Sequence, residues 1–133
     1  AVYLPGGFPN LYASELSANR QMHQALRQFV DGGGVLYAEG SSLGFLARTM
    51  TLNSGTSLEM AGILPGDATL FSAKLGKRIP VEVKSVRQSV FTRVGERFRG
   101  YRDPMFVYRS SEISEPLFEL SPQQGEGSFD GVA

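Results

Sequence analysis

Residues 35–50 read VLYAEGSSLGFLARTM, an apolar run typical of a buried strand followed at once by an apolar run at helical spacing. Many enzymes hold a nucleophile at such a strand-to-helix junction, because the tight turn exposes the side chain beside backbone N–H donors. Here the junction carries Glu39, Gly40, Ser41 and Ser42. The pattern leaves three interpretations open: a catalytic elbow, an elbow that has lost its nucleophile, or a plain turn.

A serine nucleophile at this junction requires small residues on both sides and a histidine within reach. Gly40, Ser41 and Ser42 together are flanked by Glu39 and Leu43, and the one histidine of the chain, His23, falls in a helical pattern. We expect His23 on a solvated flank of that helix, beside its apolar stripe. The chain has no cysteine, which excludes a thiolate nucleophile and disulfides. The residues therefore disfavour a serine or cysteine hydrolase.

A second glycine turn, PGGFP, follows the short apolar run of residues 1–4. The amides of Gly6 and Gly7 are suited to binding an anion or an oxyanion, although the glycines also serve simply to make the turn tight. The loop is not a phosphate-binding P-loop, which requires GxxxxGK[ST]. Together with free amides at residues 40–43, it predicts a pocket for a small anion or a carbonyl oxygen.

The elements that must position these two loops alternate along the first half of the chain. Residues 1–4 and 35–38 predict strands, and residues 43–50 predict a helix. Residues 10–31 predict a helical segment in which Asn10 and Ser17 are both candidate N-caps, so that a short first turn leads into a longer helix from about Ala18. Two strands joined by a helical crossover are parallel, and sites form at their carboxyl ends. Both glycine turns stand at such ends, so we expect them to face one crevice.

The second half predicts an antiparallel arrangement. Residues 79–84 alternate between apolar and polar, residues 90–101 resemble a hairpin around Gly95, and residues 105–112 read as another strand. The basic residues of this second half are interpreted as solvent-exposed side chains on strand edges, where their charge discourages aggregation.

Glu39, in the first half, is open to two interpretations. Its carboxylate orients a ligand amine, or it simply interacts favourably with the helix dipole at the start of a helix.

Composition narrows the class of protein. The 133 residues are 41% hydrophobic and carry thirteen basic and thirteen acidic side chains, so no global charge recruits nucleic acid. No apolar run reaches the roughly 20 residues that span a bilayer, and no signal segment opens the chain. We therefore expect a cytoplasmic protein that binds neither nucleic acid nor membrane.

Longer motifs carry a resemblance to a known family. The stretch YLPGGFPNLYASELSANRQMHQALRQFVDGGGVLYAEG, followed by MAGILPG and more loosely by GERFRGY, resembles the glutamine amidotransferase domain of cobyrinic acid a,c-diamide synthase. This resemblance implies an α/β, three-layer class I glutamine amidotransferase-like (flavodoxin-like) fold, with a partial parallel sheet and an antiparallel extension in the C-terminal half. We expect residues 1–133 to form one such domain, incomplete at both ends.

In that family a cysteine at the elbow hydrolyses glutamine, and the ammonia amidates corrin carboxylates activated by ATP with magnesium in a separate P-loop domain. Aligned on YAE, the cysteine falls on Gly40, while Tyr101 and Arg102 stand where the family has histidine and glutamate. The family's histidine partner of the cysteine belongs to a C-terminal segment that this chain does not contain. The resemblance thus implies a degenerate elbow at Glu39, Gly40, Ser41 and Ser42, no metal site and no cofactor in this chain.

By the same resemblance, Gly6 and Gly7 match the family's oxyanion loop. The expected function is a glutamine amidotransferase-like domain of cobalamin biosynthesis without glutaminase activity of its own. Its expected partners are a P-loop ATP-binding domain or subunit, a corrinoid or small anion, and further copies of itself in a homo-oligomer. The alternative is a non-catalytic interaction or assembly module on the same fold.

Overall fold

The computed structural model describes residues 1–71, 79–102, 106–112, 116–121 and 129–132. The chain divides into two compact units, the first formed by residues 1–76 and 103–112 and the second by residues 77–102 and 113–133.

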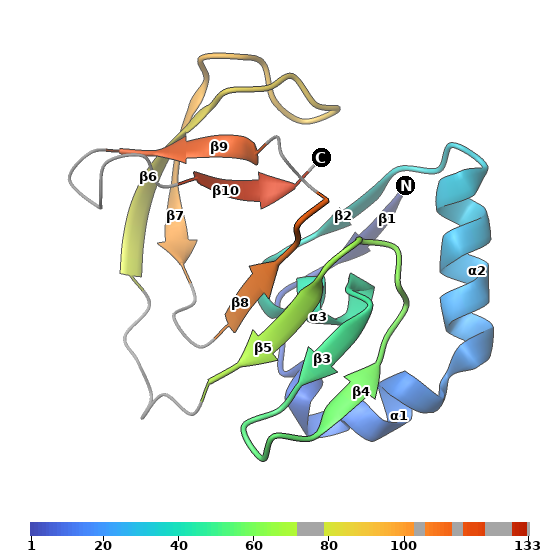
Figure 1. Ribbon diagram of the computed structural model, residues 1–133. Helices are drawn as coiled ribbons and strands as arrows, with labels where there is room; N and C mark the ends of the chain where they lie inside the picture. Colours follow the sequence, from blue (N-terminus) through green and yellow to red (C-terminus); the bar gives the residue numbers. More distant parts are fainter. Residues whose placement is uncertain (72–78, 103–105, 113–115, 122–128, 133) are drawn as a thin grey trace. The chain divides into compact units, whose positions relative to one another are not determined.

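The first unit is a mixture of helices and two small sheets (Figure 1). One sheet is the parallel pair β1–β2, and the other is four-stranded with the order β4-β3-β5-β8, in which β3 and β5 are parallel. This confirms the α/β class. The elements are β1 (Val2–Leu4), the 3-10 helix η1 (Pro9–Tyr12), α1 (Ala13–Ala18), α2 (Arg20–Asp31), β2 (Leu36–Ala38), the 3-10 helix η2 (Gly40–Ser42), α3 (Leu43–Leu46), β3 (Thr49–Thr51), β4 (Ser57–Glu59), β5 (Asp67–Leu70) and β8 (Phe106–Arg109).

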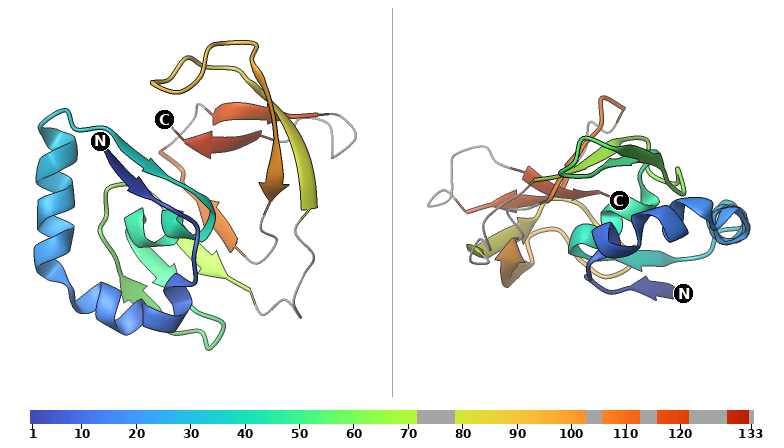
Figure 2. Two further views of the ribbon diagram at one scale, coloured as in Figure 1. Left: turned by 180° about the vertical axis from the view of Figure 1, so that it is seen from behind. Right: turned by 90° about the horizontal axis from the view of Figure 1, so that it is seen from below.

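The predicted parallel pairing of the first two strands is confirmed. Val2 lies opposite Leu36 and Leu4 opposite Ala38, and the connection runs through η1, α1 and α2, which Figure 2 shows from behind. The expected caps of the helical segment were wrong. The break falls at Asn19, whose Oδ1 accepts a hydrogen bond from the amide of Met22 at 3.1 Å and so caps α2.

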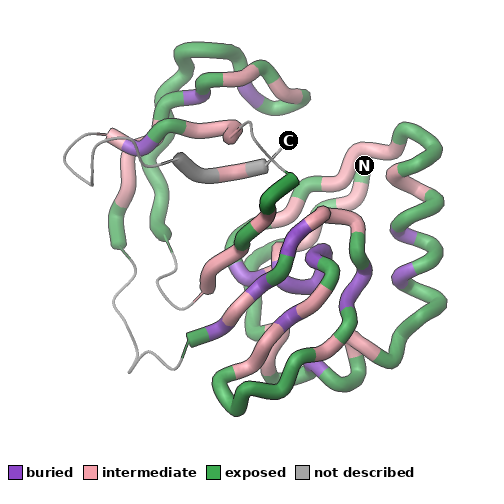
Figure 3. The backbone as a smooth tube through the Cα atoms, viewed as in Figure 1, coloured by how far each residue is buried: buried purple, intermediate pink, exposed green. Residues whose placement is uncertain are grey.

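The core of the first unit gathers around β3, and Figure 3 shows the buried backbone positions. The helix expected over residues 43–50 begins at Leu43 as predicted but is shorter, because α3 ends at Leu46, Ala47 is extended and Met50 lies in β3. Apolar periodicity cannot separate a buried helix from a buried strand when a segment is enclosed on all sides. The buried apolar residues of this core are Ala13, Leu26, Phe45, Leu46, Ala47, Met50, Met60, Ala61, Ala68 and Leu70.

His23 contradicts the expectation of a solvated flank, since only 2% of the residue is exposed. Its Nε2 lies 2.8 Å from the carbonyl oxygen of Leu16, and its ring packs against Phe45 with the ring centroids 5.4 Å apart. The neighbouring Met22 is 46% exposed instead. α2 thus buries Leu26 of the predicted stripe but places His23 rather than Met22 in the core, because the hydrogen bond to Leu16 lets an imidazole take a core position.

The second unit is an antiparallel sheet with the strand order β10-β9-β6-β7. The hairpin predicted within residues 90–101 was wrong in its first strand, because residues 90–94 belong to a loop and β7 pairs instead with residues 79–85. Gly95 does lie in the turn before β7, with a φ of +91°. Phe98 and Phe118 meet edge to face on one side of this sheet, with ring centroids 6.0 Å apart. The strands are β6 (Ile79–Ser85), β7 (Arg97–Arg102), β9 (Pro116–Leu120) and β10 (Phe129–Val132).

The strand expected at residues 105–112 is β8, which pairs antiparallel with β5 in the first unit. Among the described residues, no helix is long and apolar enough to span a membrane.

Candidate functional site

The strand-to-helix junction has the backbone of an elbow. β2 ends at Ala38, Glu39 is extended, and Gly40 turns the chain with a φ of +53° into η2 and α3. This left-handed conformation strains any residue with a Cβ, and a strained turn of this kind is what exposes the nucleophile of an elbow. A Cβ built on Gly40 meets no atom within 4 Å, so the space above the turn is open.

The glycine loop after β1 lies directly against this turn. Ser41 Oγ donates a hydrogen bond to the carbonyl oxygen of Gly7 at 2.6 Å, and Ser42 Oγ donates one to the carbonyl oxygen of Pro5 at 2.5 Å. A Cβ on Gly6 would lie 3.7 Å from the carbonyl oxygen of Glu39. The structure therefore brings together all six residues singled out from the sequence, and it uses the two serine hydroxyls to tie the loops to each other.

The amides at the turn are less available than the sequence predicts. The amide of Ser42 donates to the carbonyl oxygen of Glu39 at 3.1 Å, and the amide of Leu43 donates to the carbonyl oxygens of Gly40 and Ser41. The expectation of free amides is wrong at these two positions, because the 3-10 turn forms i→i+3 bonds that use them. The candidates that remain for binding an anion are the amides of Gly6, Gly7, Gly40 and Ser41.

Glu39 points toward two tyrosines that sequence reasoning did not assign to the site. The rings of Tyr3 and Tyr37 stack with centroids 5.5 Å apart. Their pKa values are raised, by burial first and then by the negative charge of Glu39 and hydrogen bonding to it. Strand alternation could have indicated this tyrosine pair. Val2 and Leu4 face the core, so Tyr3 faces outward, and the parallel register places Tyr37 beside it.

Further polar groups lie on the second unit, away from the elbow in sequence. Tyr101 and Arg102 belong to β7, and Tyr101 is 71% exposed. Among the described residues, no three histidine, aspartate or glutamate side chains gather as a metal site would require.

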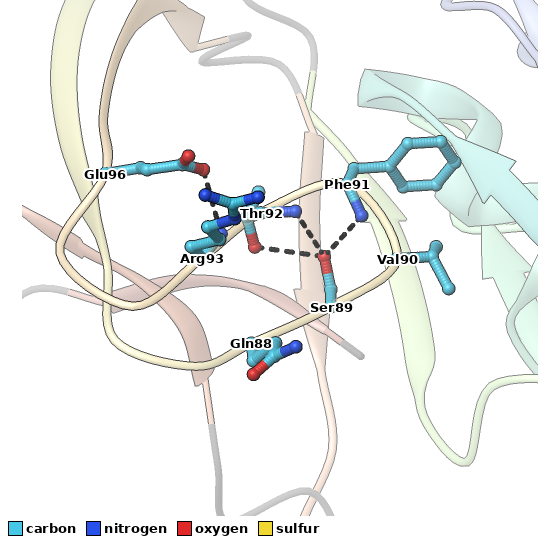
Figure 4. Close-up of a pocket in the computed structure, with 7 residues that line it drawn as sticks. All are labelled: Gln88, Ser89, Val90, Phe91, Thr92, Arg93 and Glu96. Atoms are coloured by element: carbon cyan, nitrogen blue, oxygen red, sulfur yellow. Dashed lines mark hydrogen bonds between the residues drawn. The ribbon is translucent and has the colours of Figure 1, made fainter.

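A hollow of about 450 Å³ lies in the loop between β6 and β7 (Figure 4). Ser89 Oγ accepts hydrogen bonds from the amides of Phe91 and Thr92, each at 3.1 Å, and the amide of Arg93 donates to Glu96 Oε2 at 2.8 Å. These polar groups hold the turn, and no histidine stands among the lining residues to activate Ser89. The hollow is therefore a feature of the loop backbone rather than a catalytic site.

The backbone of the elbow leads to a first prediction. Gly40→Ala is expected to lower the free energy of unfolding by about 1 kcal/mol, because alanine disfavours a positive φ even where it touches nothing. Gly7→Ala is the matched control, since its Cβ also meets nothing within 4 Å and its φ is not positive. Urea unfolding of both variants measures the difference, and equal stability of the two would contradict the left-handed turn.

Comparison with known proteins shows which proteins this chain is similar to. Residues 1–133 match the model of the CobB/CobQ-like glutamine amidotransferase domain. The cobyrinate a,c-diamide synthase of Gloeobacter violaceus is 35% identical over 134 residues, covering 96% of this chain and 28% of that protein. The synthases of Salmonella typhimurium and Methanothermobacter thermautotrophicus are 34% identical over 104 residues and 29% over 136 residues, covering 75% and 99% of this chain. The chain spans 22% and 28% of the lengths of these two relatives.

Proposed function

Because this chain belongs to the CobB/CobQ-like glutamine amidotransferase domain family, we propose that it serves corrinoid amidation as an amidotransferase-like domain without glutaminase activity of its own. The relatives named above are cobyrinate a,c-diamide synthases, which supports a role in the amidation of corrin carboxylates. Ammonia for that reaction comes, in this proposal, from free ammonium or from another subunit.

The observation that supports the proposal is that Gly40, at the elbow, has no side chain. An amidotransferase of this class attacks the glutamine amide with a thiolate at the elbow, and a hydrogen atom cannot replace that thiolate. Ser41 does not take over the role, because the residue is 6% exposed and its hydroxyl already donates to Gly7. A main-chain carbonyl is not a base that removes the proton of a serine hydroxyl.

The histidine base of the family's mechanism is also lacking beside the described elbow. His23 is buried in the core, and its Nε2 is engaged with the carbonyl oxygen of Leu16. A nucleophile and its base must lie within hydrogen-bonding reach of each other. The described residues therefore supply the turn and the loop of an amidotransferase but not the pair of side chains that performs hydrolysis.

In this proposal ATP and magnesium are bound outside this chain. The sequence has no GxxxxGK[ST] motif, and no cluster of three candidate metal ligands occurs among the described residues. Activation of the corrin carboxylate is accordingly assigned, within this proposal, to a separate P-loop domain or subunit. What this chain would contribute is the shape of the crevice and its main-chain donors.

Glutamine hydrolysis by the purified chain tests the proposal. Ammonia release from glutamine is expected to equal the rate in buffer, for the wild type and equally for Gly40→Ala and Ser41→Ala. Turnover above that background, abolished by either substitution, would show that the elbow is catalytic and would overturn the proposal.

A second candidate is a non-catalytic interaction or assembly module, and the outer face of β1–β2 favours it. Parallel strands are normally covered on both faces, yet Tyr3 and Tyr37 are 55% and 39% exposed. Light scattering across a range of protein concentrations tests this module as a homo-oligomer. A mass that rises with concentration supports it, and a constant monomer mass counts against it.

A further inference from the structure

β7 is the terminal strand of the second unit's sheet, and all six of its residues are exposed. Within the part of the chain that the structure describes, it pairs with β6 on one side only. A terminal strand leaves a row of N–H and C=O groups without ladder partners, which is a template for another extended segment. The edge of β7 is thus a surface with defined hydrogen-bonding chemistry.

The hydrogen bonds of β6 reveal which groups of β7 face outward. The amide of Ser121 donates to the carbonyl oxygen of Glu82 at 3.0 Å, so the main chain of Glu82 faces away from β7. Arg99 lies opposite Glu82, and in such a non-hydrogen-bonded pair both main chains point away from each other. By alternation, Arg97, Arg99 and Tyr101 direct their N–H and C=O groups toward the free edge.

The same three residues place their side chains on one face, and that face is basic. The strand register places Lys84, Arg97 and Arg99 on this face, and opposite them the carboxylates of Glu82 and Glu119, which leaves the basic side chains in excess by one. Glu82 alone meets both Arg97, at 3.2 Å, and Arg99, at 3.1 Å. These two guanidinium groups lower the pKa of Glu82, chiefly through their hydrogen bonds. One carboxylate shared by two guanidiniums leaves a positive charge that an acidic partner would neutralise.

The face also offers room for a partner's side chain. A shallow hollow of about 410 Å³ is lined by Pro80, Val81, Glu82, Arg99, Gly100 and Tyr101. Tyr101, which is 71% exposed, stands beside this hollow on the same face as Arg99. Peptides that add a strand to a sheet take affinity from main-chain hydrogen bonds and specificity from such openings.

We propose that the free edge of β7 binds an extended acidic peptide segment by strand addition, beyond any role of the elbow. A second copy of this chain is a poorer occupant. Antiparallel pairing of two β7 strands about Arg99 would set the two Arg99 side chains directly opposite each other, and like charges in that position are destabilising. An acidic strand would instead place carboxylates against Arg97 and Arg99.

The test is binding of a fluorescein-labelled peptide of alternating glutamate and valine to the whole chain, followed by fluorescence anisotropy. Saturable binding that weakens with added salt is expected. Arg99→Pro removes one outward N–H and one charge, at a position where an edge strand tolerates proline, and it is expected to weaken binding about tenfold. Arg99→Gln removes the charge only and is expected to weaken binding about threefold.

Two controls keep this test decisive. Arg20→Gln removes another exposed, ion-paired arginine, from α2 in the first unit, and binding is expected to be unchanged. Arg99→Glu, which keeps the backbone donors, is expected to prefer a lysine–valine peptide over the glutamate–valine one, and circular dichroism confirms that each variant is folded. Absence of saturable binding, equal binding by the wild type and Arg99→Pro, or an equal loss in Arg20→Gln would overturn the proposal. So would binding to anionic lipid vesicles in place of the peptide.

Discussion

Met50→Ala is expected to lower the free energy of unfolding by about 2–5 kcal/mol, the range for truncating a buried methionine. Met50 is fully buried, with 0% of the residue exposed, at the centre of the strand that pairs with both β4 and β5. Its sulfur lies 3.1 Å from the position that a Cβ on Gly44 would occupy, so helix α3 packs against it. Truncation leaves a cavity that the two sheet neighbours and the helix cannot close without moving.

Met22→Ala is the matched control for that loss. Met22 is 46% exposed on α2, so its truncation is expected to change the free energy of unfolding by less than about 0.5 kcal/mol. Urea titration followed by circular dichroism measures both variants. Similar losses in the two would show that the core of the first unit is not centred on β3.

Gly66→Ala is expected to cost about 3 kcal/mol, at the upper end for inserting a methyl group into a packed site. A Cβ on Gly66 would collide with the carbonyl oxygen of Arg109 and would lie 2.6 Å from the hydroxyl oxygen of Tyr108. Main-chain atoms of β8 cannot yield as a flexible side chain does. The strain would therefore fall on the β5–β8 pairing, in which Asp67 lies opposite Arg109.

Gly100→Ala separates this steric effect from the general effect of replacing glycine. The Cβ at residue 100 meets nothing within 4 Å, and alanine in a strand is no worse than glycine, so stability is expected to be unchanged or slightly higher. Thermal unfolding of the two variants provides the measurement. A tolerated alanine at residue 66 would mean that β5 and β8 approach less closely than described.

The parts of the fold that the sequence predicted are those with local signals. Glycine turns flank the first two strands, and their apolar runs joined by a helical segment implied the parallel β1–β2 pair. The turn at Gly40 and the loop at Gly6 and Gly7 were both recognisable as turns from glycine alone. Their proximity followed from the rule that parallel strands end at the same edge.

The errors arose where a tertiary contact decides between local alternatives. The core position of His23 depends on a carbonyl of Leu16 that the helix pattern does not reveal. The short α3 and the strand of Met50 share one enclosed apolar segment, where periodicity carries no information. The serine hydroxyls were weighed as nucleophiles, but their partners are the carbonyls of Gly7 and Pro5, which lie more than thirty positions earlier in the chain.

We propose that the elbow keeps its backbone without a nucleophile, and covalent labelling distinguishes this from a catalytic elbow. The chain is incubated with an electrophilic diazoketone analogue of glutamine, and its intact mass is then measured. We expect the wild-type mass to be unchanged and Gly40→Cys to gain one adduct, located at residue 40 by peptide mapping, because the space above the turn is open. An adduct on the wild-type chain, at Ser41 or Ser42, would contradict the account.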